Sequence, residues 1–96
     1  AEHPKNTEVI TVLEDTGVRL GNLFSWVGLR QKQKGEAEKS REMFAQAAEY
    51  TRQALDYMER RRALNPNEPR LVRRLFVANL NLSTAHKYSG RLEEAL

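Results

Sequence analysis

Hydrophobic residues recur along most of this chain at the three- and four-residue spacing of one helix face. No segment shows the strict alternation of apolar and polar residues that is expected of a half-buried strand. The pattern therefore predicts an all-α fold, with helices over residues 7–32, 36–64 and 69–87 and a fourth helix that begins near residue 91. The three apolar stripes are Val9, Leu13, Gly17, Leu20, Phe24 and Val27; Ala37, Ser40, Phe44, Ala47, Thr51, Leu55 and Met58; and Leu71, Leu75, Ala78, Leu82 and Ala85.

The prolines lie at the ends of the predicted helices or outside them, where they break no helical hydrogen bond. Pro69 suits the first turn of a helix, and residues 64–67, Leu-Asn-Pro-Asn, read as a short connector. Asn6 and Asn67 are expected to cap the helices that follow them. The chain thus divides into an N-terminal tail (1–6), a long first hairpin (7–66) and a second hairpin (67–96) with a truncated second helix.

Three glycines, Gly17, Gly21 and Gly28, lie near one line on the first predicted helix. Each glycine costs a helix about 1 kcal/mol relative to alanine. Their spacing predicts that the backbone of another helix approaches closely along this line.

Two parts of the sequence echo each other. Residues 19–28, Arg-Leu-Gly-Asn-Leu-Phe-Ser-Trp-Val-Gly, align with residues 81–90, Asn-Leu-Ser-Thr-Ala-His-Lys-Tyr-Ser-Gly. Leucine matches leucine, Trp26 matches Tyr88 and Gly28 matches Gly90, at an offset of 62 residues. An echo of this kind indicates two copies of one helical unit.

The segment 90–96, Gly-Arg-Leu-Glu-Glu-Ala-Leu, resembles the turn and second-helix start of a tetratricopeptide repeat. Leu20-Gly21 resembles the small-residue step of that repeat's first helix, and Ala47 and Ala54 followed by Asn65-Pro66 resemble its second helix and closing proline. The resemblance covers about residues 7–96 and is closest to longer-period relatives, such as those beside bacterial serine/threonine kinases. It implies antiparallel helical hairpins whose first helices line a concave groove.

The first unit is longer than the second by 14 residues, because Ala47 follows Gly28 by nineteen positions whereas Ala95 follows Gly90 by five. If the insertion is divided evenly, each helix gains seven residues, or about two turns. The turn then falls at Gly35. A flexible loop over residues 30–39 is the alternative.

The resemblance implies a protein–protein interaction module that binds a peptide or partner protein in the groove. Asparagine side chains there could offer a donor and an acceptor to a peptide backbone, and Arg19 and Lys87 could meet an acidic group. Val18 stands where the carboxylate-clamp members of the family have lysine, which argues against capture of a terminal carboxylate. In the alternative interpretation, Trp26 and Tyr88 pack against a neighbouring helix. The predicted peptide-binding residues are Arg19, Asn22, Trp26, Asn81, Thr84, Lys87 and Tyr88.

The chain has no cysteine, which excludes disulfides, thiolate metal sites and a cysteine nucleophile. Ser83 and His86 share a helix face, but no third, orienting acid accompanies them. The two histidines are not clustered with carboxylates as metal ligands would be. We therefore expect no enzymatic activity, no metal site and no cofactor.

The formal net charge is +3, and arginines at 60–62, 70, 73 and 74 flank the second connector. A basic helical domain that binds nucleic acid is the alternative function, although no aromatic residues interleave with these arginines as stacking platforms. No apolar run approaches the roughly 20 residues of a membrane span. We expect no membrane insertion and, by default, a cytoplasmic location.

Helix 69–87 carries apolar residues on more than one face, including Val72, Phe76 and Leu80. The predicted helix at 91–96 is too short to cover them. The sequence therefore predicts either that the chain is part of a longer array or that it self-associates. A purely structural, oligomerising segment remains the third interpretation.

Overall fold

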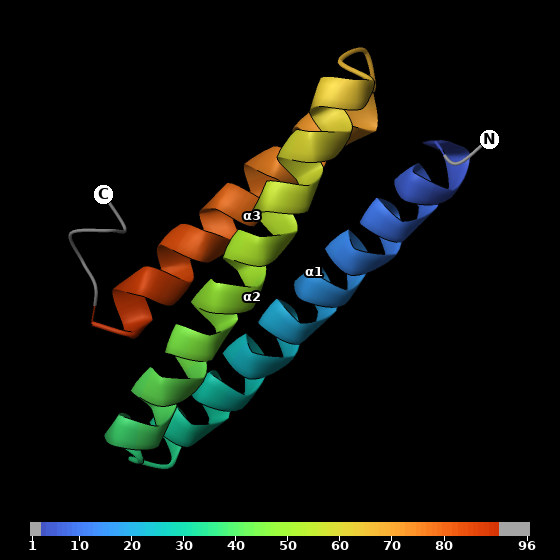
Figure 1. Ribbon diagram of the computed structural model, residues 1–96. Coiled ribbons are helices and arrows are strands. Elements are labelled where there is room, and N and C mark those ends of the chain that lie inside the picture. The colour runs from blue at the N-terminus through green and yellow to red at the C-terminus, as the bar shows by residue number, and fades with distance from the viewer. Residues whose placement is uncertain (1–2, 91–96) are drawn as a thin grey trace.

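Three α-helices make up the computed structural model, which describes the backbone of residues 3–90 and the side chains of residues 8–90. Their bounds are α1 His3–Gln33, α2 Ala37–Leu64 and α3 Pro69–Tyr88. Figure 1 shows α2 between α1 and α3, with each helix antiparallel to the next, so that α1 and α3 run in the same direction. The described residues contain no strand, and the predicted all-α fold of antiparallel hairpins is confirmed.

The helix boundaries agree with prediction at α2 and α3 and differ at the start of α1. Because α1 begins at His3, part of the predicted tail is helical, and Asn6 lies within the helix instead of capping it. Pro4 falls in the first turn, where a proline removes no helical hydrogen bond. Glu68, not Asn67, occupies the N-cap position of α3, and its side chain makes no capping hydrogen bond. Pro69 follows it in the first turn, where the missing N–H of proline removes no helical hydrogen bond.

The connection between α1 and α2 is a tight turn around Gly35. This residue has a φ of +79°, in the left-handed region that glycine adopts without strain. The Gly35 N–H donates to the Lys32 carbonyl at 3.1 Å, and the Glu36 N–H donates to the Gln31 carbonyl at 2.9 Å. These bonds give partners to carbonyls in the last turn of α1, where the helix itself supplies no further N–H donors. The turn thus lies at the residue where an even division of the insertion places it, and helix continues on both sides.

The glycines of α1 face α2 across a very short distance. A methyl group at Gly17 would lie 3.0 Å from both the Ala54 Cβ and the Tyr50 carbonyl oxygen. One at Gly21 would lie 2.5 Å from the Thr51 Oγ1. The predicted close approach along the glycine line is therefore confirmed, and α1 and α2 are in contact almost backbone to backbone.

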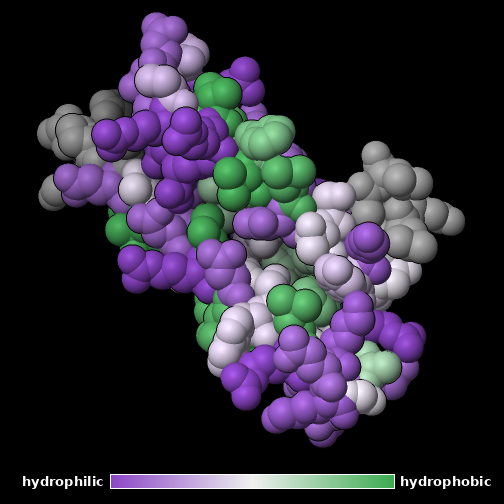
Figure 2. Space-filling model, turned by 180° about the vertical axis from the view of Figure 1, so that it is seen from behind, coloured by the Kyte–Doolittle hydropathy of each residue, from purple (hydrophilic) through white to green (hydrophobic). Residues whose placement is uncertain are grey.

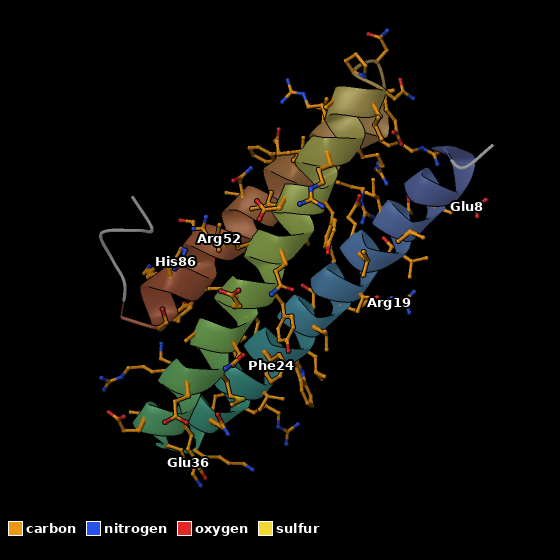
Figure 3. All side chains as sticks on the ribbon, viewed as in Figure 1. Glu8, Arg19, Phe24, Glu36, Arg52 and His86 are labelled. Carbon is orange, nitrogen blue, oxygen red and sulfur yellow. The ribbon has the colours of Figure 1, made fainter. Side chains whose placement is uncertain are left out.

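Farther along the same interface, polar and aromatic groups fill the space beside the glycines. The Ser40 hydroxyl donates to the Gly28 carbonyl at 2.7 Å. A methyl group at Gly28 would lie 2.9 Å from the ring of Phe44. The rings of Phe24 and Tyr50 stack with centroids 5.5 Å apart, and Figure 3 shows Phe24 on the side of α1 that faces α2.

The interface between α2 and α3 is an aliphatic core. Leu55 and Met58 of α2 pack with Leu71, Leu75 and Ala78 of α3, and all five are buried. Burial of each large side chain is worth about 1.5–3 kcal/mol. This core therefore holds α3 on α2.

Many other large apolar side chains remain exposed. Val72, Phe76 and Leu80 form a row along α3 with exposed fractions of 57%, 65% and 53%. Figure 2 shows hydrophobic residues along the middle of one face of the molecule. The fourth helix predicted from residue 91 lies outside the described residues. None of the helices at residues 3–90 is long and apolar enough to cross a membrane.

Candidate binding groove

A hollow of about 210 Å³ opens where α1 and α3 face each other across α2. All three helices contribute to it, so it forms when α1, α2 and α3 are packed together. We call it the central hollow; its lining residues are Val18, Asn22, Thr51, Met58, Arg73, Arg74, Val77, Ala78 and Asn81.

The central hollow has an apolar floor and polar edges. Met58 and Ala78 are buried at its base, and Val77 is partly exposed along one wall. Asn22 of α1 and Asn81 of α3 are both exposed, and neither side chain makes a hydrogen bond within the described chain. The volume is below the roughly 300–1,000 Å³ of small-molecule sites. The hollow therefore suits a single apolar side chain, with amides beside it that can bond to a backbone.

A buried ionic cluster fixes the position of Arg74, which lines the central hollow. The Glu14 side chain is fully buried; its Oε2 lies 2.7 Å from the Arg74 Nη2, and its Oε1 lies 3.1 Å from the Arg61 Nη1. The contact with Arg61 is an ion pair without hydrogen-bond alignment at Oε1. Arg74 also contacts Asp15 at 2.9 Å, and Arg61 contacts Glu68 at 3.5 Å. The cluster ties all three helices together and neutralises Arg61 and Arg74.

A second hollow, lined by Pro69, Arg70, Arg73 and Arg74, adjoins the first and shares Arg73 and Arg74 with it. We call it the basic hollow. Arg70 and Arg73 are exposed, and neither forms an ion pair with any described residue. Of the arginines around the second connector, Arg61 and Arg74 thus form internal ion pairs, whereas Arg70 and Arg73 remain available to a ligand.

The structure brings some of the predicted peptide-binding residues together and separates others. Asn22 and Asn81 line the central hollow from opposite helices. Arg19, Trp26 and Thr84 line neither the central hollow nor the basic hollow. Figure 3 shows Arg19 on the outer side of α1, pointing away from α2. Trp26 is 57% exposed, and the Arg30 guanidinium lies 5.0 Å from its ring centroid.

Lys87 and Tyr88 line a third hollow, at the C-terminal end of α3. The Tyr88 ring packs on Phe44 of α2 with centroids 5.0 Å apart. This contact agrees with the alternative interpretation of Tyr88, in which it packs against a neighbouring helix. The Lys32 ammonium lies 4.3 Å from the same ring centroid, and the Lys87 ammonium lies 5.9 Å from it. We call this the terminal hollow; its lining residues are Lys32, Ala37, Ser40, Arg41, Lys87, Tyr88 and Gly90.

Sequence reasoning missed the floor and one wall of the central hollow. Thr51 and Met58 come from α2, the second helix of a hairpin, whereas the resemblance implies a groove lined by first helices. Arg73 and Val77 lie one turn apart on α3, away from its buried stripe. The signal for this wall is in the sequence: Val77 is an apolar residue outside the main stripe of α3, and the cation Arg73 precedes it by one turn.

The groove offers apolar contact, neutral amides and guanidinium charge. The described residues hold no group of three or more His, Cys, Asp or Glu side chains that could bind a metal ion. Compared with protein-family models, curated proteins and solved structures, the chain matches none of them.

Proposed function

We propose that this chain is a protein-interaction module that binds an extended peptide segment between α1 and α3. The observation that carries the proposal is the placement of Asn22 and Asn81 on opposite sides of an apolar hollow. Each amide presents a donor and an acceptor that the described chain does not use. An extended segment has free backbone N–H and C=O groups, whereas a helical ligand has already satisfied its own. The amide pair therefore favours an extended ligand with one side chain in the hollow.

The test uses peptides selected from a displayed random heptapeptide library on the immobilised chain, then synthesised with a fluorescent label. Changing Asn22 and Asn81 together to alanine should weaken their binding about tenfold or more, since each lost hydrogen bond is worth about 0.5–1.5 kcal/mol. Fluorescence polarisation measures the affinity, and circular dichroism checks the fold.

Asn79→Ala is the matched control. Asn79 is an exposed asparagine on the same helix, and its amide donates to the Leu75 carbonyl at 2.9 Å, so it does not face the hollow's ligand. It should leave affinity unchanged. If the selected peptides bind the double variant as well as the original chain, the groove is not their binding site and the proposal is wrong.

Self-association is a second candidate role, favoured by the row of Val72, Phe76 and Leu80. Two copies that pair through this row would remove apolar surface from water on both. Sedimentation should then show a dimer that Phe76→Ser weakens. A monomer at high micromolar concentration would exclude this role without affecting the peptide groove.

A further inference from the structure

Charge is segregated in this molecule. The central, basic and terminal hollows are lined by Arg70, Arg73, Arg74, Lys32, Arg41 and Lys87, and none of their lining residues is an aspartate or glutamate. Yet the whole chain has 13 acidic residues against 16 basic ones. Among the described residues, cations therefore line these hollows, whereas the aspartates and glutamates lie outside the lining.

The cations beside the central hollow differ in their availability. Arg74 is held by the carboxylates of Glu14 and Asp15. Arg73, the neighbouring residue, lines both the central and the basic hollow and has no acidic partner among the described residues. Arg70 extends the same positive surface by one turn. A ligand side chain with negative charge can therefore pair with Arg73 without competing against a carboxylate at residues 8–90.

Helix geometry sets the spacing that the ligand must match. Arg73 precedes Val77 by four residues, which is about 6 Å along α3. Residues i and i+2 of an extended peptide lie on the same side and are about 6.6–6.8 Å apart. A peptide that runs along α3 with its apolar residue beside Val77 would thus bring an acidic residue two positions away to Arg73.

We infer that the groove selects an acidic peptide, in which an apolar side chain fills the central hollow and an aspartate or glutamate two positions away pairs with Arg73. This inference rests on the peptide-binding function proposed above and specifies its ligand. Nucleic acid fits less well, because no aromatic ring lines the central or the basic hollow to stack on a base. A carboxylate, by contrast, can form a bidentate, charge-assisted pair with the exposed guanidinium of Arg73.

The test uses synthetic fluorescent heptapeptides with a fixed central leucine, in which each other position carries aspartate, serine or lysine in turn. They are titrated against the original chain, Arg73→Glu and Arg52→Glu, with a single-stranded oligonucleotide as a further probe. Arg52 is the matched control, because it is exposed, has no ion pair with the described residues and lines none of the three hollows. Both variants change the net charge equally, and circular dichroism confirms their fold.

Aspartate two positions from leucine should bind about tenfold more tightly than serine there, which is the size of one charge-assisted contact. Arg73→Glu should abolish or reverse this preference, and Arg52→Glu should keep it. The inference is wrong if the peptides bind through Asn22 and Asn81 but show no preference for aspartate. It is also wrong if the preference for aspartate persists in Arg73→Glu. In either case the proposed peptide-binding function is unaffected. Absence of peptide binding overturns both. Oligonucleotide binding that exceeds peptide binding and is lost in Arg73→Glu assigns the surface to nucleic acid and overturns the inference as well.

Discussion

The two interfaces of α2 use opposite means of packing. Toward α1, small groups pack so closely that an added methyl group would lie 3.0 Å from the Ala54 Cβ at Gly17 and 2.5 Å from the Thr51 Oγ1 at Gly21. Toward α3, large aliphatic side chains such as Met58 and Leu71 are buried to 1% exposure. The first interface has no room for an added atom, and the second depends on the volume that its side chains fill. Both shape the groove, because the close approach sets the position of Val18 and Asn22 and the aliphatic core sets that of Val77 and Asn81.

The largest effect is expected where the two interfaces are joined, at Glu14. Glu14→Ala leaves Arg61 and Arg74 without their buried partner, and breaking a buried ion pair in this way typically costs about 3–5 kcal/mol. Urea unfolding followed by circular dichroism measures the change in the free energy of unfolding. Asp15→Ala is the control, because Asp15 contacts the same arginine but its side chain is 48% exposed. It should cost less than about 1 kcal/mol. Equal losses for the two variants would show that burial of Glu14 is not what stabilises the cluster.

A smaller loss is expected in the aliphatic interface. Leu71→Ala removes a side chain with 1% exposure and leaves a cavity, which should destabilise the fold by about 2–4 kcal/mol. The same change at Leu80, which is 53% exposed on the same helix, should cost about 0.5 kcal/mol or less. The midpoints of urea unfolding give both values. If Leu80→Ala proved as costly as Leu71→Ala, the outer side of α3 would be buried in solution, in favour of self-association.

The smallest effect, and the one most specific to the close interface, concerns Gly21. Gly21→Ala should gain up to about 1 kcal/mol in helix propensity but lose more, because the new methyl group would meet the Thr51 Oγ1 at 2.5 Å. We expect a net loss of about 1 kcal/mol. Combining it with Thr51→Ala removes the clash, so the double variant should be more stable than the sum of the two single changes predicts. A gain in stability from Gly21→Ala alone would show that α1 and α2 can separate at little cost.

Much of the fold could be predicted from local signals. The periodic stripes gave α2 and α3 nearly to the residue, because helical spacing of apolar positions needs no knowledge of the partner surface. Gly35 at the turn and the glycine line facing α2 also followed from spacing. The start of α1 was missed because Pro4 and Asn6 read as signals of a boundary although a helix tolerates both in its first turns.

What the sequence determined by itself is the set of helices, their antiparallel order and the buried faces of α2 and α3, since these depend on residues a few positions apart. The apolar stripe of α1 was only partly right, because Val9 and Leu13 are exposed in the structure. Tertiary structure alone decided the composition of the groove. Glu14 and Arg74 are 60 positions apart, and no periodicity reveals that they meet. The rotation of α1 about its axis likewise placed Asn22 in the central hollow and Arg19 outside it, although both lie on the predicted peptide-binding helix. That rotation is set by how closely the glycines allow α1 to approach α2, which is a property of the packed pair of helices.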